Sequence, residues 1–562
     1  MLHVTGITTY YFLKENQMQK RVTPSNLHSF LLLTLLTAVV FGNTLGHGFV
    51  LDDRNFVTYK EAYRNLDIAT ILFSLKTNDL EYLPVRDLSY VVDFALWGKT
   101  AAGFHFSNVV WYWMNVIAVY LLSTKLAVLF RENVADQESD GFSRVNGLFA
   151  AALFAVHPIH CETVNFITCR NALVSGACFC FSSFSYLQHL TTPPSQMRRL
   201  FYWISFVCFV LSLFAKATGI ILPLFLLICT CYFGRPLCKQ RWVELLPFFL
   251  MSGGGFFLFR SVALKTRIIP EVPFCATAAC LSEKFATALQ IPLFYLKKLC
   301  IPSGYTVDYN LEQFGTSLSD VRSVIALAVT IGTGIIVWHL RQRKPLLLFC
   351  CAWYLITLIP VLHIFPTVPT VADRYAFLPS LPFIIIISAT FTQFLEERRT
   401  VLAWLCLLFV AGLSTISIQQ NQTWKNEKTL WEYTLHVNPR SSAALSVLAR
   451  LSFYQDKNYN KALELARKAN EVNNNNLEFD RLRGELSLRN RRPDYAVVLF
   501  KSALDKDPED VETLVSLGRA YEMLGDKMTA KRYYQSAINS HQVYLPGNMR
   551  EKAVIFLQNL EQ

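Results

Sequence analysis

Charged residues are scarce in this chain. They make up 17% of its 562 residues, whereas soluble globular proteins carry about 25%. The chain also lacks a Cys-x-x-Cys pair and a glycine-rich nucleotide-binding fingerprint. Many of its 14 cysteines lie inside apolar runs, where they act as small hydrophobic residues and do not reveal the redox compartment. Long apolar runs recur, which excludes an intrinsically disordered protein.

The basic residues are distributed as in membrane proteins. A formal net charge of +12 would by itself fit nucleic-acid binding, but many Lys and Arg side chains flank apolar segments, which is the pattern that orients membrane proteins. We therefore expect a membrane and no nucleic acid as partner. The stretch before Phe30 does not fit a signal peptide, because the apolar run that follows it lacks a small-residue cleavage site.

Apolar segments recur along the first three quarters of the chain. Spanning a bilayer takes about 20 residues in a helix, and the sequence predicts an all-α bundle of about eleven spans over residues 27–419. The predicted spans are 27–45, 104–129, 145–157, 171–190, 200–215, 217–232, 242–260, 320–339, 345–362, 374–392 and 400–418. A further apolar stretch, 285–301, carries Lys297 and Lys298, and we expect it to lie in the membrane interface.

The positive charges predict the orientation. Lys14, Lys20 and Arg21 precede the first span, which favours a cytoplasmic N-terminus over residues 1–26. If 285–301 does not cross, the later basic clusters are also cytoplasmic: Arg198/Arg199, Arg235/Lys239/Arg241, Arg341/Arg343/Lys344 and Arg398/Arg399. The long first loop, 46–103, and everything after the last span are then exported. A glycosylation pattern, Asn421-Gln422-Thr423, falls on the exported side.

The composition turns polar after Trp424, and a 34-residue repeat begins. Gly484, Ala496 and Phe500 recur as Gly518, Ala530 and Tyr534 at this period, which is the small/large pattern of tetratricopeptide (TPR) repeats. We predict an exported TPR α-solenoid over 424–562. Its three repeats are expected near 441–474, 475–508 and 509–542, with a capping helix near 548–560.

Carboxylates open the exported loop. Asp52 and Asp53 follow the first span directly, and adjacent carboxylates at a membrane surface can supply a general base or hold a divalent cation. A solvated helix cap is the alternative. No convincing metal site is predicted from these residues.

Ionisable residues also follow the third span. His160 and Glu162 can position an acid/base group or a cation, and Arg170 on the next helix can bind phosphate. The alternative is an ion pair between Glu162 and Arg170. A zinc site at His157-x-x-His160 lacks further ligands.

Three more residues are placed at the same face. Lys216 separates two short apolar runs and can receive a lipid phosphate or extend its ammonium group to the interface. Arg374 offers a forked guanidinium for phosphate, and Asp308 lies in the loop before the eighth span. Charge counting did not use these residues, yet it places them all on one side of the membrane.

With these motifs, nearly the whole chain resembles the transmembrane and TPR-repeat-containing O-mannosyltransferase family of the GT-C glycosyltransferase superfamily, bacterial relatives included. The matching elements are Asp52-Asp53, Tyr82-Leu83-Pro84-Val85, Phe104-His105-Phe106-Ser107-Asn108, His157-Pro158…Glu162…Arg170, Lys216 with Thr218-Gly219, Asp308-Tyr309, Asp373-Arg374-Tyr375…Leu378-Pro379-Ser380 and Trp424…Glu427…Leu430.

The resemblance implies a polyprenyl- or dolichyl-phosphate sugar donor, typically of mannose. It also implies inverting transfer to Ser/Thr hydroxyls of an exported protein that the TPRs bind. Asp52 or Asp53 would be the base, Arg170, Lys216 and Arg374 would bind the lipid phosphate, and supporting roles would fall to Arg86, His105 and Asp308. No cofactor is implied beyond the donor. The membrane would be a bacterial inner membrane or that of the endoplasmic reticulum.

The chain departs from the family pattern at Leu51, Leu83, Asn171 and Ala217, where the family tends to carry an aromatic, an arginine and two acidic residues. These departures motivate an alternative, a catalytically inactive membrane scaffold that binds exported proteins through its TPRs. A transporter is a third class, but the spans show no two comparable halves.

Overall fold

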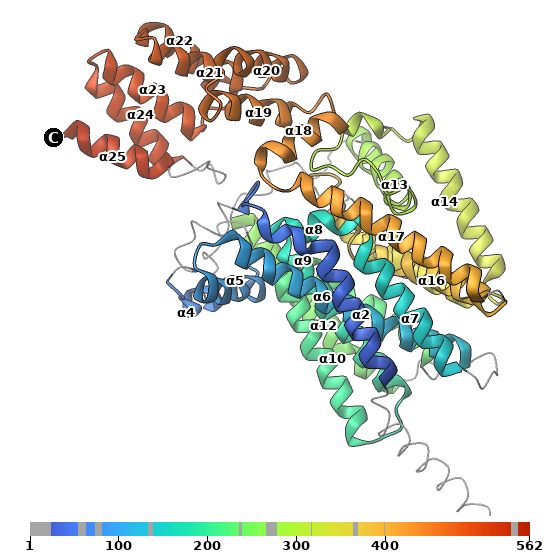
Figure 1. The fold of residues 1–562 in the computed structure, drawn as a ribbon. Coiled ribbons are helices and arrows are strands. Elements are labelled where there is room, and N and C mark those ends of the chain that lie inside the picture. The colour runs from blue at the N-terminus through green and yellow to red at the C-terminus, as the bar shows by residue number, and fades with distance from the viewer. Residues whose placement is uncertain are drawn as a thin grey trace, which may run out of the picture.

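A computed structural model describes residues 24–561 apart from 54–62, 64, 74–80, 133–138, 235–238, 266–277, 316, 363–368, 398 and 541–548. The described residues form helices and connecting segments, and none of them forms a strand. Figure 1 shows a large helical bundle with a curved array of shorter helices above one of its ends. Lys14, Lys20, Arg21, Arg235 and Arg398, which entered the charge counting, lie outside the described residues.

A helix covers most or all of each predicted span. These helices are α2 (Pro24–Phe41), α6 (Ala101–Glu132), α7 (Ser139–Val156), α9 (Arg170–Thr191), α10 (Gln196–Ala215), α11 (Leu222–Phe233), α12 (Lys239–Lys265), α14 (Val321–Leu340), α15 (Pro345–Leu358), α16 (Ser380–Glu397) and α17 (Arg399–Thr423). By length and composition, 5 described helices can each cross a membrane, or up to 6 if a pair bent by 53° is one span. The all-α, multi-pass architecture is confirmed, and the count of eleven spans stays a prediction.

The bent pair breaks at a proline. α7 ends at Val156 and α8 (Cys161–Asn165) follows after a short turn that begins at Pro158. Proline lacks a backbone N–H group and keeps the residue before it out of the helical conformation, so His157 cannot continue α7. The redirected chain carries Glu162 into the interior, where it is 2% exposed.

The helix ends that charge counting places outside the membrane come together. The Asn421 amide in the last turn of α17 donates to Val40 O at 2.8 Å in α2, and the Asn165 amide donates to Asn421 Oδ1 at 2.7 Å. Asn421 is fully buried by these contacts. The expected glycosylation at this residue is therefore wrong for the folded protein, because its amide nitrogen is not accessible.

The stretch 285–301 belongs to α13 (Ala278–Cys300). The side-chain amide of Gln290 donates to Ser323 Oγ in the first turn of α14 at 3.1 Å, and the phenol of Tyr295 donates to Ala372 O at 3.1 Å. Leu299 O lies 3.1 Å from His157 Nε2. The second half of α13 thus contacts three segments that charge counting places at one face, and the interfacial position of 285–301 stays a prediction.

Three helix pairs follow where the sequence predicts TPR repeats. They are α19 (Ser442–Tyr454) with α20 (Tyr459–Val472), α21 (Glu478–Arg489) with α22 (Pro493–Lys506), and α23 (Val511–Met523) with α24 (Lys527–Asn539), and α25 (Met549–Glu561) follows. A Cβ added at Gly518 would lie 2.5 Å from the ring of Tyr534. The same relation joins Gly484 to Phe500, so the small residue of each pair lets the helices nest.

Three further helices complete the described fold. α18 (Glu427–Val437) joins the bundle to the TPR array (Figure 1), and α4 (Ile68–Phe73) and α5 (Pro84–Trp97) fold from the loop after α2. Asn426 caps the start of α18 by accepting from the backbone N–H of Thr429 at 3.0 Å. α18 therefore begins directly after the last helix of the bundle.

Candidate active site

The two adjacent aspartates lie in different environments in the structure. The Asp53 carboxylate is fully buried and accepts from the backbone N–H and the hydroxyl of Thr168, each at 2.8 Å. Burial raises the pKa of Asp53 to about 7, although these hydrogen bonds oppose the shift. Asp53 therefore joins the start of the loop after α2 to the segment before α9.

Asp52 is the more accessible carboxylate, and no hydrogen bond joins its side chain to another described residue. Burial raises its pKa, whereas the nearby charge of Arg374 lowers it. The preceding residue, Leu51, has a φ of 50°. This left-handed conformation costs about 1 kcal/mol for a residue with a side chain, and such strain is frequent beside functional groups.

Glu162 and Arg374 form the central ion pair, across 212 residues of sequence. One Glu162 oxygen binds the guanidinium of Arg374, and the other accepts from its backbone N–H at 2.9 Å. The Glu162 side chain is 2% exposed and that of Arg374 is 20% exposed. The ion pair and the backbone hydrogen bond thus fix the position of Arg374, while part of its side chain remains accessible.

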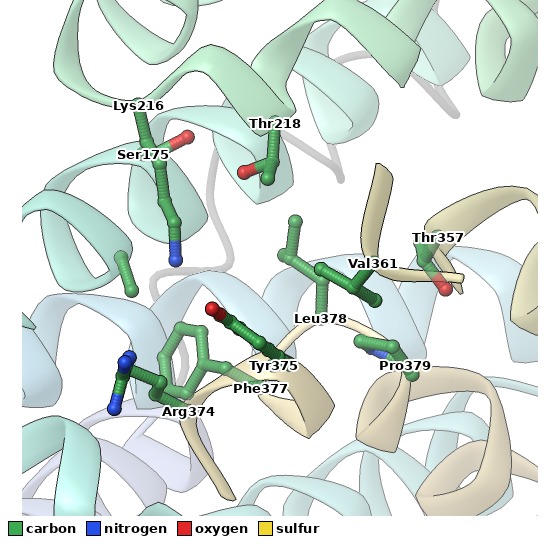
Figure 2. A pocket seen from close by; sticks show the side chains of 11 residues that line it. Ser175, Lys216, Thr218, Thr357, Val361, Arg374, Tyr375, Phe377, Leu378 and Pro379 are labelled. Carbon is green, nitrogen blue, oxygen red and sulfur yellow. The ribbon is translucent and has the colours of Figure 1, made fainter. Parts of the chain in front are cut away.

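A pocket lies beside the open face of Arg374. It has a volume of about 350 Å³ and is lined by Ala172, Ser175, Lys216, Thr218, Thr357, Val361, Arg374, Tyr375, Phe377, Leu378 and Pro379. Figure 2 shows the Lys216 side chain running from the end of α10 toward Arg374. Burial lowers the pKa of Lys216, and the positive charge of Arg374 lowers it further. Two cations facing one small pocket attract an anion.

Arg170 is not part of this pocket. Its guanidinium pairs with Asp93 and donates to Asn108 Oδ1 at 2.7 Å and to Phe104 O at 2.8 Å. The Tyr90 ring lies 4.8 Å from it, and the whole residue is inaccessible. The structure therefore does not support the predicted phosphate contact, and the expected alternative partner, Glu162, is taken by Arg374. Arg170 instead locks α5 and α6 onto α9.

The structure also gives His160 a packing role. Its Nδ1 atom lies 2.9 Å from both Tyr112 Oη and Phe154 O, and its Nε2 atom lies 3.0 Å from Ser380 Oγ. Both ring nitrogens are therefore occupied inside the bundle, which does not support the predicted acid/base or cation-positioning role.

The predicted supporting residues occupy three places. Arg86 is buried and pairs with Asp87 and Glu81, and His105 lies 3.4 Å from Gly48 O. Asp308 accepts from the hydroxyl of Ser441, which caps α19. Asp308 thus joins the bundle to the TPR array and does not reach the Lys216 pocket.

Several partners could not be found by sequence reasoning. Asp93 and Thr168 carry no motif of their own, and they matter because the fold brings them against Arg170 and Asp53. Asp93 lies in the predicted first loop, where polar residues are common, so the sequence carried only a weak signal that it would pair with Arg170. Among the residues that the structure describes, no group of three or more His, Cys, Asp or Glu side chains could hold a metal ion.

Comparisons with known proteins agree with this architecture. A tetratricopeptide-repeat family model matches residues 499–532. A protein O-mannosyl-transferase of Caenorhabditis elegans is 22% identical over 78% of this chain and 63% of its own length. Protein O-mannosyl-transferase Tmtc3 of Drosophila melanogaster is 23% identical over 74% of the chain and 52% of its own length. Protein O-mannosyl-transferase TMTC3 of Mus musculus is 22% identical over 94% of the chain and 56% of its own length.

A solved structure also aligns with the chain. It is the archaeal oligosaccharyltransferase AglB from Archaeoglobus fulgidus, in complex with an inhibitory peptide and a dolichol-phosphate, at 10% identity and a TM-score of 0.39. The alignment covers 79% of this chain and 59% of that one.

The helices, the buried ion pairs and the repeats define a multi-pass α-helical membrane protein with a C-terminal TPR array. Over most of its length the chain is similar to protein O-mannosyl-transferases, the family that the sequence motifs indicated, and part of its C-terminal region is similar to a tetratricopeptide repeat. It spans between half and two thirds of the length of the curated relatives it matches, with 63%, 52% and 56% of them covered.

Proposed function

We propose that the protein is a membrane glycosyltransferase that moves a sugar, in the first instance mannose, from a polyprenyl- or dolichyl-phosphate donor to Ser/Thr hydroxyls of an exported protein. The observation that carries the proposal is the pocket in which Lys216 and Arg374 face each other. The names of its relatives, protein O-mannosyl-transferases, support the same reaction.

The chemistry follows from the charges. A lipid phosphate bound between Lys216 and Arg374 would gain negative charge as the bond between the sugar and the phosphate oxygen breaks, and the two cations would stabilise that charge. The acceptor oxygen would attack the sugar carbon from the opposite side, which inverts its configuration. Asp52 would take the proton of the acceptor hydroxyl. Asp53, which is already hydrogen bonded, would position the loop that carries Asp52.

The site retains both cations and Asp52, and this favours an enzyme over an inactive scaffold. Of the departures from the family pattern, Ala217 begins the short helix after Lys216 and leaves the lysine facing the pocket (Figure 2). We further propose that the TPR array binds the exported acceptor and that the enzyme resides in a bacterial inner membrane or in the endoplasmic reticulum.

The test is a transfer assay. The full chain in lipid nanodiscs is given polyprenyl-phosphate mannose, or the glucose donor in parallel, together with a Ser/Thr peptide. We expect Asp52→Asn to lower turnover by about 10²-fold or more, as loss of a general base does. Lys216→Met should also lower it, whereas the matched exposed-site variant Lys428→Met should not.

Two outcomes would contradict the proposal. Full activity in both the Asp52→Asn and the Lys216→Met variants would show that the site has been misassigned. A wild-type chain that transfers no sugar from any donor, yet retains an exported protein through its TPRs, would favour the inactive scaffold.

A further inference from the structure

A groove opens at the end of the helical bundle that faces away from the candidate active site. α6 starts beside that site, where the side chain of Asn108 binds Arg170, and the TPR array lies above the same end (Figure 1). Ser123, the first groove residue on α6, is 15 residues further along, which is about 22 Å at the rise of an α-helix. The walls come from α6, α7, α15 and α16, and the lining residues are Ser123, Leu126, Ala127, Phe130, Arg131, Asn146, Leu346, Ile385, Ala389 and Gln393.

The groove is larger than the pocket beside Arg374. It has a volume of about 660 Å³, against about 350 Å³ there, and ligand sites commonly measure about 300–1,000 Å³. Small side chains contribute to this space, because Ala127 on α6 and Ala389 on α16 both line it. A molecule with a long chain of atoms therefore fits between these helices.

Polar and apolar groups are separated along the groove. α6 and α16 both run from the active-site end of the bundle toward the opposite end, and Arg131 and Gln393 line the groove near their last turns. Leu126 and Ile385 line it further inside, where both are buried. The groove thus has a polar mouth and an apolar interior, the same order of polarity as a phospholipid from its head group to its acyl chains.

The hydroxyl of Ser123 is a buried donor in this groove. Ser123 is 1% exposed, and its Oγ atom has no hydrogen-bond partner among the described residues. The neighbouring Thr124, by contrast, donates to Tyr120 O at 2.7 Å, as hydroxyls inside helices commonly do. A buried donor without an acceptor is unfavourable, so an oxygen atom of a bound molecule would stabilise it.

Positive charge lies at the mouth of the groove. Arg131 is the charged side chain of the lining, and no Asp or Glu is among the described residues that form it. Arg343 and Lys344, both exposed, immediately precede α15, whose second residue, Leu346, also lines the groove. A guanidinium presents a fork of donors that matches phosphate, and basic pockets between transmembrane helices bind anionic head groups. We therefore expect an occupant with negative charge at the mouth.

We infer that this groove binds an anionic phospholipid of the leaflet that faces away from the candidate active site. Its phosphate pairs with Arg131, an ester oxygen accepts from Ser123, and an acyl chain packs against Leu126 and Ile385. The polyprenyl chain of a sugar donor is apolar throughout and offers no acceptor to Ser123. A free phosphate ion would leave the apolar interior unfilled.

This site is separate from the Lys216–Arg374 pocket, and the inference does not rest on the proposed transferase activity. A phospholipid in the groove contacts α6, α7, α15 and α16 together. Because it binds the folded bundle and not the unfolded chain, it should raise the temperature of unfolding as its concentration rises above its dissociation constant.

The experiment uses the full chain in micelles of a nonionic detergent. Phosphatidylglycerol and phosphatidylcholine with identical acyl chains are titrated separately, native mass spectrometry counts the bound lipids, and the midpoint of thermal unfolding is the second readout. We expect one phosphatidylglycerol to bind about tenfold more tightly than phosphatidylcholine, the order that one or two basic residues give at a charged membrane surface. Glycerol 3-phosphate, which lacks acyl chains, should not compete.

Three variants test the contacts. Arg131→Gln should weaken phosphatidylglycerol binding about tenfold and remove the preference over phosphatidylcholine, and Ser123→Ala should weaken it about threefold. Ala389→Leu fills the groove without removing a polar group, and it should weaken binding of both lipids. Arg199→Gln is the matched control, because Arg199 is exposed on α10, outside the groove, and it should leave binding unchanged.

Several outcomes would overturn the inference. Equal affinity for the two lipids, or competition by glycerol 3-phosphate, would show that the groove does not recognise an anionic phospholipid. Unchanged binding in both Arg131→Gln and Ala389→Leu would show that the lipid binds elsewhere. Binding that is lost in Lys216→Met but kept in Arg131→Gln would place the lipid in the pocket beside Arg374.

Discussion

Arg170 gives the sharpest test of how the bundle is held together. Its guanidinium is inaccessible and pairs with Asp93, Asn108 and the carbonyl of Phe104. Replacing it with methionine keeps the bulk but leaves the Asp93 carboxylate buried and unpaired. Breaking a buried ion pair from one side costs about 3–5 kcal/mol, so we expect the free energy of unfolding in detergent to fall by about that amount.

The sign of the pH dependence follows from Asp93. Burial raises its pKa while Arg170 lowers it, so without Arg170 the carboxyl binds a proton more readily. The loss of stability in Arg170→Met should therefore grow as the pH rises, because the carboxyl without its arginine partner is then charged in the folded state. The double variant Arg170→Met/Asp93→Asn should recover part of the loss, because no unpaired buried charge remains.

The assay is unfolding of the full chain in mixed micelles, followed by intrinsic tryptophan fluorescence. Arg322→Met is the control, since that ion pair with Asp320 is exposed, and it should shift the midpoint very little. If Arg170→Met lowers the free energy of unfolding by no more than about 1 kcal/mol, which is the range of surface ion pairs, the claim that the buried Arg170 ion pair stabilises the bundle is refuted.

Two further predictions concern the loop and the repeats. The pKa of Asp53 is raised from 3.8 to about 7 on folding, so stability should fall as the pH rises from about 4 to 7, and Asp53→Asn should remove this slope in unfolding midpoints. Gly518→Ala places a methyl 2.5 Å from the Tyr534 ring and should destabilise the TPR array by about 1–3 kcal/mol. Hydrogen exchange in α23 and α24 reports this loss, and Gly412→Ala, which has open space around it, should leave exchange there unchanged.

Hydropathy and periodicity predicted most of the architecture, because those signals are local. Each apolar run became a helix, and the repeated glycine–aromatic spacing placed Gly518 against Tyr534. The side of the membrane assigned to each loop came from charge alone and stays a prediction, while the helix ends assigned to one side do meet in the structure through Asn165 and Asn421.

The pairing of the ionisable residues was harder to predict, because it depends on three-dimensional proximity. Glu162 lies only eight residues before Arg170, and this proximity in the sequence suggested an ion pair between them. In the structure Glu162 instead pairs with Arg374, 212 residues away, and Arg170 pairs with Asp93. Sequence reasoning identified candidate residues, and the structure shows how these candidates pair and which of them remain accessible to a ligand.

The central claim is that Lys216 and Arg374 receive the phosphate of a lipid donor. The most direct measurement is an electron cryomicroscopy structure of the full chain in nanodiscs at saturating polyprenyl phosphate. We predict phosphate density between the Lys216 ammonium and the Arg374 guanidinium, and its absence in Lys216→Met. An empty pocket at saturation, or lipid phosphate bound at another site, would contradict the account.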